Sequence, residues 1–234
     1  MANSARNQPG GTGKKIKDEE INPLTLDKIE SFYETNKKRI STITTVVLVV
    51  VVGAFAYFKL YKGPTEEKAA TALSFSQRYF EADSLNMALN GDGKNLGFTK
   101  IAKKYSGTSA GNLALYYEGI CYLKMGDYAN AIKSLKDFDG KGTMLGAMAY
   151  GSLGEAYMES GDNAKAIESF KKATADKDDI LVTPMFLYHL GMAYEAGGKN
   201  ADAIAAFKRI RDEYPKSMHA RDMDKELARL GDVN

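Results

Sequence analysis

The sequence predicts an all-α protein in which one apolar helix is followed by a stack of similar helical hairpins. Two observations predict it: residues 40–58 form a run without charged side chains, and three later segments repeat one spacing of glycine, alanine and aromatic residues. Roughly 170 residues follow the apolar run, which is enough for one domain with its own core. We therefore expect a tail at 1–39, a membrane-spanning helix at 40–61 and a folded domain at 62–234.

The tail divides into a polar start and a short amphipathic segment. Residues 1–17 are mostly Gly, Asn, Ser and Lys, with little to bury, so we expect them to be disordered. Asn22 before Pro23 is typical of a helix start. The helix that begins there would lie on the bilayer surface or dock on a partner protein, and both alternatives stay open. Its apolar side chains, the candidate tail docking residues, are Leu24, Ile29, Phe32 and Tyr33.

The apolar run has the length of a membrane span. Its residues would form a helix of about 28 Å, close to the roughly 30 Å thickness of the hydrocarbon layer. A strand of this length is not expected, since strands rarely exceed about ten residues. Tyr57, Phe58 and Tyr61 lie at its C-terminal border beside Lys59 and Lys62, an arrangement typical of the membrane interface. We therefore expect a transmembrane helix.

A cleaved signal peptide is the alternative to a permanent span. Ala54-Phe55-Ala56 resembles a signal-peptidase site, but it lies inside the apolar run, and 39 residues precede that run. Lys37, Lys38 and Arg39 adjoin the N-terminal end of the run. By the positive-inside rule the N-terminus is cytoplasmic, which predicts a single-pass protein with its domain exported.

The three similar segments share one pattern of residues. Each contains Gly at one position, Ala 12 residues later and Leu or Phe 16 residues later, and the segments follow one another at steps of 35 and 37 residues. A Gly-Asp or Gly-Lys turn lies between the Gly and the Ala of each segment. The segments begin Leu115-x-x-Glu118-Gly119-x-x-Tyr122, Tyr150-x-x-Leu153-Gly154-x-x-Tyr157 and Leu187-x-x-Leu190-Gly191-x-x-Tyr194.

This pattern resembles the tetratricopeptide repeat, whose first helix reads W-x₂-L-G-x₂-Y. Small residues at the Gly and Ala positions let the two helices of a hairpin approach closely, and the large residues fill the space around them. The resemblance implies a TPR α-solenoid of three clear hairpins, at 112–138, 147–173 and 184–210. A degenerate first hairpin is expected at about 66–105, with helical stretches at 66–89 and 95–105, and a closing helix at 217–230.

The resemblance also implies a protein-binding groove. In the family, positions 2, 5, 9 and 12 of each first helix line the concave face, and here most of them are apolar or methionine. Flexible thioethers suit a surface that adapts to varied apolar segments, although several of these side chains could instead pack against the next hairpin. The candidate groove residues are Tyr116, Ile120, Leu123, Met148, Met158, Met185, Tyr188 and Met192. Tyr116 and Ile120 occupy positions where carboxylate-clamping repeats have Lys and Asn, so recognition of that type is not expected.

The sequence contains no recognisable catalytic or metal-binding motif, so we expect a protein that is not an enzyme and uses no cofactor, metal or small-molecule substrate. His189 and His219 lack metal-ligand spacing to a second His or Cys. Cys121, the one cysteine, fits a small buried position. Residues 63–234 carry 22 basic against 24 acidic side chains, so no nucleic-acid partner is expected.

The whole architecture resembles the ancillary SecYEG translocon subunit family, the YfgM-like proteins of bacterial inner membranes. That resemblance implies a periplasmic TPR domain, association with the Sec translocon, and contact with membrane lipid, periplasmic chaperones and exported client proteins. The alternative is an envelope scaffold or assembly factor, in cell division or secretion, that binds one fixed partner. The sequence does not name the partner, fix the oligomeric state or client range, or decide between groove and tail as the main contact.

Overall fold

The computed structural model describes residues 23–176 and 178–232, and side chains from residue 27 on. The predicted disordered start at 1–17 and the Asn22 cap lie outside the described residues. The chain divides into two compact units, Met1–Tyr57 and Phe58–Asn234, which we describe separately.

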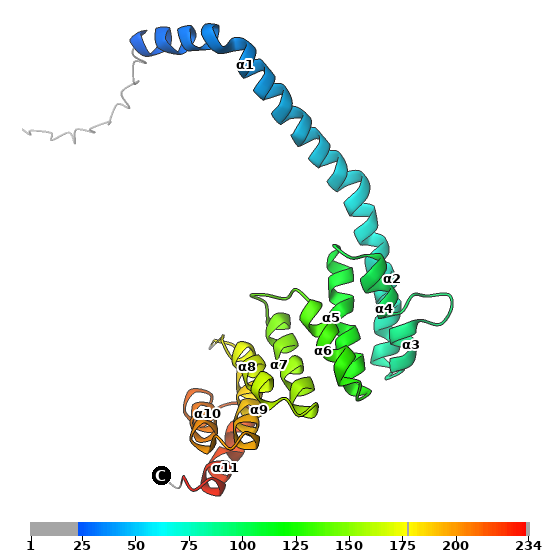
Figure 1. Ribbon diagram of the computed structural model, residues 1–234, viewed down its shortest axis with the longest axis vertical. Helices are drawn as coiled ribbons and strands as arrows, with labels where there is room; N and C mark the ends of the chain where they lie inside the picture. The colour runs from blue at the N-terminus through cyan, green and yellow to red at the C-terminus, as the bar shows by residue number, and fades with distance from the viewer. Residues whose placement is uncertain (1–22, 177, 233–234) are drawn as a thin grey trace, which may run out of the picture. The chain divides into compact units, whose positions relative to one another are not determined.

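The first unit contains a single helix, α1 (Pro23–Ala56). The short tail helix and the membrane-spanning helix expected from the sequence are therefore one element, because no Gly or Pro interrupts residues 24–52. Figure 1 shows that α1 bends part-way along. The hydroxyls of Ser31, Thr35 and Thr42 donate to backbone carbonyls three or four residues earlier, a pattern that bends helices.

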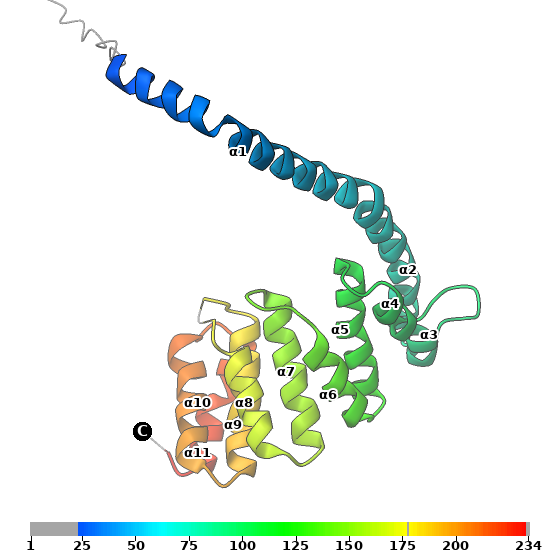
Figure 2. The ribbon, with the colours of Figure 1, turned by 45° about the horizontal axis from the view of Figure 1, so that its top comes forward.

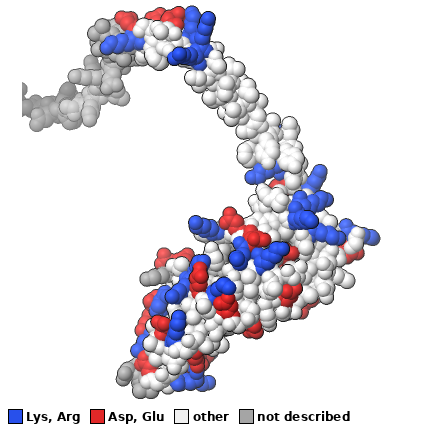
Figure 3. All heavy atoms as spheres, in the orientation of Figure 1, with Lys and Arg blue, Asp and Glu red and all other residues white. Residues whose placement is uncertain are grey.

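The apolar part of α1 is not covered by the described residues of its own unit. The side chains from Val46 to Val52 are 54–63% exposed, and Figure 3 shows this stretch as an uninterrupted uncharged surface. Within the described part of the chain, one helical stretch, Asp27–Glu81, is long and apolar enough to cross a membrane by length and composition.

After the π-helical turn Tyr57–Lys62, the second unit continues with α2 (Gly63–Glu81), α3 (Leu85–Asn90) and α4 (Phe98–Lys104). The helix expected over 66–89 is interrupted, because Asp83 adopts a left-handed conformation with φ 53°. The loop between α3 and α4 is closed by Asp92, whose carboxylate accepts hydrogen bonds from the backbone of Lys94 and from the Tyr79 hydroxyl.

Three helical hairpins and a closing segment follow, side by side in Figures 1 and 2. The predicted all-α solenoid of three clear hairpins is confirmed, and no strand occurs among the described residues. The closing segment is a 3₁₀ turn continued by a short α-helix, where the sequence predicts one helix. The elements are α5 (Ser109–Lys124), α6 (Tyr128–Asp137), α7 (Met144–Glu159), α8 (Asn163–Ala173), α9 (Val182–Ala196), α10 (Asn200–Glu213), η2 (Met218–Asp222) and α11 (Met223–Arg229).

Repeated capping contacts fix where these helices begin. The hydroxyls of Thr108 and Thr143 accept hydrogen bonds from the third residue along, at the starts of α5 and α7. The carboxylates of Asp127 and Asp162 do the same at the starts of α6 and α8. These side chains satisfy backbone donors that have no partner within the helix, so the repeated turn sequences set the hairpin boundaries.

The core of the domain consists of three clusters of buried residues. One joins α2–α5 around Phe98 and Ile101, and the largest joins α8–α11 around Phe170 and Phe207. The smallest lies where α5 and α6 meet α7 and contains Tyr116, Leu135, Ala149 and Leu153. The stack is therefore held together in sections, each formed by neighbouring hairpins.

The repeated glycines allow the helices of a hairpin to touch. A Cβ atom added at Gly154 would lie 2.6 Å from the ring of Phe170, and one at Gly191 would lie 2.3 Å from the ring of Phe207. Gly119 meets Leu135 in the same way. The large residue of the second helix therefore packs directly on the glycine of the first, as the spacing in the sequence requires.

Candidate protein-binding surface

The first helices of the hairpins form one continuous face. Helix α5 contacts α7 and α7 contacts α9, whereas α6, α8 and α10, as described, do not contact one another. Elements that are closer together lie on the inside of a curved stack, so α5, α7 and α9 line its concave face. This is the face on which the resemblance places the candidate groove.

The candidate residues on α5 are only partly available to a partner. Tyr116 is 7% exposed and belongs to the smallest core cluster. Ile120 is half-buried against the same cluster, and Leu123 is half-buried. Tyr116 therefore serves mainly to pack α5 against α7, the role that the sequence left open for any single groove residue.

The candidate residues on α7 and α9 are more accessible. Met148, Met158, Met185 and Tyr188 are half-buried, with one side on the core cluster of α8–α11. Met192 is 40% exposed. The structure thus brings four methionines to two adjacent helices of the concave face, and their side chains can change rotamer to fit a partner.

A polar pair, not predicted from the sequence, lies between these methionines. Glu155 Oε1 of α7 is 3.8 Å from Nε2 of His189 on α9. Burial raises the pKa of Glu155, while burial and the neighbouring His219 lower the pKa of His189. Nδ1 of His189 is buried and has no hydrogen-bond partner. No spacing rule links these two residues, because the pair forms only when two hairpins stack.

The closing segment ends the face with an ion pair. The guanidinium of Arg229 on α11 donates to both carboxylate oxygens of Glu195 on α9, at 2.5 and 2.7 Å. Tyr188 stacks on His219 of η2, with ring centroids 5.6 Å apart. The C-terminal end of the concave face therefore carries charged and aromatic groups in addition to methionine.

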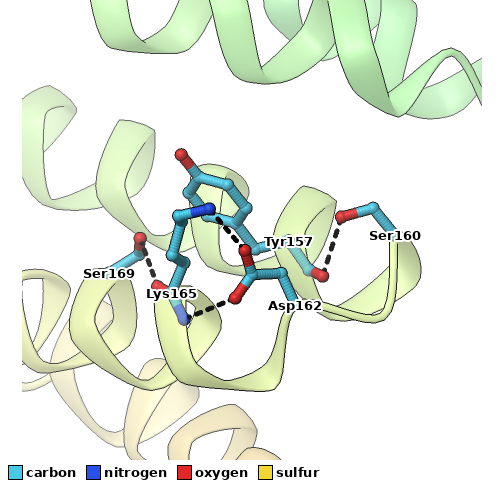
Figure 4. A network of polar contacts seen from close by, with 5 residues as sticks. All are labelled: Tyr157, Ser160, Asp162, Lys165 and Ser169. Carbon is cyan, nitrogen blue, oxygen red and sulfur yellow. Dashed lines mark hydrogen bonds and ion pairs between the residues drawn. The ribbon is translucent and has the colours of Figure 1, made fainter.

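A polar network at the turn between α7 and α8 is structural. Figure 4 shows Lys165 and the Asp162 carboxylate at the α7–α8 turn, with Tyr157 beside them. Lys165 Nζ lies 2.5 Å from the Asp162 carboxylate and 5.4 Å from the centroid of the Tyr157 ring. Hydrogen bonds from the side chain and backbone of Lys165 lower the pKa of Asp162. These contacts cap α8 and hold the α7–α8 turn.

Other reactive groups are also placed for packing. Cys121 is fully buried, and burial raises the pKa of its thiol to about 12, so it carries no thiolate at neutral pH. Within residues 23–176 and 178–232, no group of three or more His, Cys, Asp or Glu side chains is arranged to hold a metal ion.

The tail candidates lie on α1, in the first unit. Ile29, Phe32 and Tyr33 are 60%, 65% and 53% exposed, so the residues described in their own unit do not cover them. The side chain of Leu24 lies outside the described residues.

Family models place repeats on the hairpins. A tetratricopeptide-repeat model matches residues 145–217, which span α7 to the end of α10, and a second matches residues 113–139, on α5 and α6. The hairpins α5–α6, α7–α8 and α9–α10 therefore match the tetratricopeptide repeat. The first hairpin, α2–α4, lies outside both matches, in agreement with its missing Gly and Ala positions.

Solved structures share this fold at low sequence identity. The MamA protein is 20% identical with a TM-score of 0.57, over 71% of this chain and 84% of MamA. A putative kinesin light chain from Podosopora anserina, with nearly identical TPR-like repeats, is 14% identical with a TM-score of 0.56, over 72% of this chain and 88% of its own. No curated protein matches the sequence.

The tetratricopeptide-repeat domain therefore presents a concave face with two parts. Towards α5 it is closed by packing around Tyr116, and towards α9 it offers methionine, tyrosine and a half-buried Glu–His pair. Repeats of this kind act as protein-interaction modules, and the described groups suit non-covalent binding of another protein chain.

Proposed function

We propose that this chain is a membrane-anchored tetratricopeptide-repeat module that binds apolar segments of other proteins on the faces of α7 and α9. The observation that carries the proposal is the set of half-buried and exposed methionines, Met148, Met158, Met185 and Met192, on two adjacent helices of the concave face. Flexible apolar side chains favour varied partners over one rigid partner.

We propose that α1 anchors this module in the inner membrane of a bacterium, with the N-terminus in the cytoplasm and the repeats in the periplasm. The uncovered valines of α1 support the anchoring, since such a surface is costly in water and favourable in lipid. The basic residues Lys37, Lys38 and Arg39 on the N-terminal side support the orientation.

The partners we propose are the SecYEG translocon and the exported clients or periplasmic chaperones that meet it. This step rests on the architectural resemblance to the ancillary translocon subunits. An adaptable apolar face tethered next to the membrane suits brief contact with newly exported, partly unfolded chains.

A scaffold that binds one fixed partner is the second candidate, and the polar groups of the concave face favour it. The Glu155–His189 pair and the Glu195–Arg229 pair would give a partner defined positions for hydrogen bonds and charges. Directional groups of this type select one partner more strongly than methionines do.

Photo-crosslinking in membranes distinguishes these functions. A photoreactive residue at Met158 or Met192 should give adducts with translocon subunits and with many exported chains. Matched controls at Lys133 and Glu168, exposed on the second helices, should give few adducts. A single recurrent envelope protein at Met158 and Met192 would favour the scaffold, and equal labelling from all four positions would contradict the groove.

A further inference from the structure

One edge of the repeat domain is formed by the starts of its first helices. The Glu66 carboxylate, in the first turn of α2, accepts hydrogen bonds of 2.8 and 2.9 Å from the backbone of Ser109 and Ala110 at the start of α5. Asp139 lies in the connection before α7. The Asn112 side chain donates a 2.8 Å hydrogen bond to the Asp139 carbonyl and accepts a 2.9 Å hydrogen bond from the Asp139 backbone N–H. We call this side of the domain the loop edge.

Two cavities continue the loop edge towards the C-terminus. The first, of about 540 Å³, lies between the start of α7 at Gly142–Ala147 and the connection before α9. The second, of about 510 Å³, lies between that connection and the segment Glu213–His219. Ile180 and Leu181 line both cavities. The loop edge is therefore one connected strip from the start of α2 to the start of η2.

Exposed apolar side chains concentrate on this strip. Met218, Leu181, Ile180 and Met144 are 81%, 73%, 70% and 57% exposed, more than any other large apolar side chain described after residue 62. Each stands at the start of a first helix or of the closing segment. Side chains exposed to this degree at successive loops protrude from the surface, and such a cluster indicates an interaction site.

The opposite edge has a different composition. It is formed by the turns between the two helices of each hairpin, at Gly126, Gly161 and Gly198, which adopt positive φ angles. Ser160 and Lys199 stand beside two of these turns and are exposed. Met125 is the large apolar residue at these turns, and it is 44% exposed. The apolar character therefore belongs to one edge of the domain.

We propose that the loop edge rests on the surface of a lipid bilayer and inserts Met144, Ile180, Leu181 and Met218 into its interface. The start of α2 belongs to this edge, and only the six-residue turn Tyr57–Lys62 separates α2 from α1 in the sequence. Protruding side chains spread over three loops suit a fluid phase that closes around each of them. The inference rests on the proposed membrane anchoring.

The charges of the loop edge define the kind of lipid surface. Lys172 and Lys216 line the cavities, but Asp176, Asp178 and Glu213 do so as well. Electrostatic attraction to anionic headgroups therefore does not drive the contact. Insertion depends on apolar burial and occurs on vesicles of neutral phosphatidylcholine.

Fluorescence quenching by lipids tests the inference in the full-length chain. Cys121 is fully buried, so a Cys121→Ala background allows single labels at Met144→Cys, Leu181→Cys and Met218→Cys. Ser160→Cys and Lys199→Cys are the matched controls on the opposite edge. Each protein carries an environment-sensitive fluorophore and is reconstituted in phosphatidylcholine vesicles with nitroxide-labelled lipid.

We expect a blue shift and loss of fluorescence by lipid quenching at 144, 181 and 218, and neither effect at 160 and 199. Equal quenching by aqueous iodide at all five positions would overturn the inference and leave the anchoring intact. A blue shift that depends on protein density, without lipid quenching, would indicate a second copy of the chain and would also overturn it. Release of the chain by alkaline carbonate would instead reject the anchoring, and the loop-edge contact with it.

Discussion

Gly151 is a residue whose role depends on one neighbour. It lies on α7, between Met148 and Met158 in the sequence, and a Cβ atom there would lie 1.9 Å from Cζ of Phe186 on α9. The glycine therefore sets how closely two consecutive hairpins approach, and it contributes no side chain to a partner.

Gly151→Ala should destabilise the domain by about 1–3 kcal/mol, since the ring of Phe186 cannot move without disturbing its packed surroundings. In a Phe186→Ala background the same substitution should be neutral or stabilising, because helix propensity then favours alanine by about 1 kcal/mol. Urea unfolding of the four proteins measures the coupling. Equal effects of Gly151→Ala in both backgrounds would show that the ring is not the cause.

Glu118 occupies the position where the other two repeats have Leu153 and Leu190. It is 8% exposed, and burial raises the pKa of its carboxyl. A carboxyl with a raised pKa in the folded state loses its proton more easily on unfolding. The free energy of unfolding therefore falls as the pH rises from the ordinary pKa of this carboxyl, in the unfolded chain, to its raised pKa in the folded domain.

Glu118→Gln should therefore stabilise the domain at pH 7 and have little effect at pH 4. The measurement is the free energy of unfolding of both proteins from pH 4 to pH 8. Glu159→Gln, on the exposed end of α7, is the control. A stability difference independent of pH would exclude ionisation of Glu118 as the cause.

Residue spacing predicted the local contacts and missed the contacts between hairpins. The packing of Phe170 on Gly154 and of Phe207 on Gly191 follows from a fixed separation along one hairpin. The burial of Tyr116 and the Glu155–His189 pair depend on how α5, α7 and α9 stack. That stacking varies with connections of different length, which a repeat pattern does not define.

The closing segment shows at the scale of an element which interactions hold a helix in place. Met223 and Leu227 of α11 are each 1% exposed in the core cluster of α8–α11. Arg229 pairs with Glu195 nearby, but its side chain is 48% exposed. Packing should therefore matter more than the ion pair.

Leu227→Ala should lower the free energy of unfolding by about 2–5 kcal/mol, because it leaves a cavity beneath α11. Arg229→Ala should cost less than about 1 kcal/mol, since solvent screens the pair. Thermal and urea unfolding of the two variants directly compare the loss of packing at Leu227 with the loss of the ion pair at Arg229. A larger loss from Arg229→Ala would mean that the ion pair holds α11 on the domain.

Two helices differ from what the sequence predicts, for opposite reasons. In α1, residues 24–52 contain no Gly or Pro, so one helix runs through the tail and into the apolar run, although composition changes sharply between them. Between α2 and α3, the helix ends without any Gly or Pro, because Asp83 adopts a positive φ. Composition predicted both segments as helical, but their ends depend on backbone geometry.

At the scale of the whole molecule, the repeated spacing in the sequence predicts the fold class, but it does not predict the partner. Three matching segments were enough to predict the solenoid, because each glycine, alanine and aromatic residue performs the same packing task in every repeat. A partner is recognised by surface residues, which packing leaves free to vary.

The full chain should remain in the membrane pellet after alkaline carbonate extraction, and a chain that starts at Gly63 should be released. A reporter fused after residue 234 should be reached from the periplasm, and one fused before residue 1 only from the cytoplasm. These outcomes follow from the charge-free run and its basic N-terminal flank. A periplasmic N-terminal reporter would overturn the orientation.

The division of the core into three clusters also determines how the domain can deform. The smallest cluster, between the hairpin of α5 and α6 and helix α7, has four buried residues, and larger clusters lie on both sides of it. Amides of the flanking hairpins should therefore exchange with solvent as two separate cooperative units. The curvature of the concave face would then change mainly at the α5–α7 junction, while both halves stay folded. Such a change would let the face fit bound segments of different width.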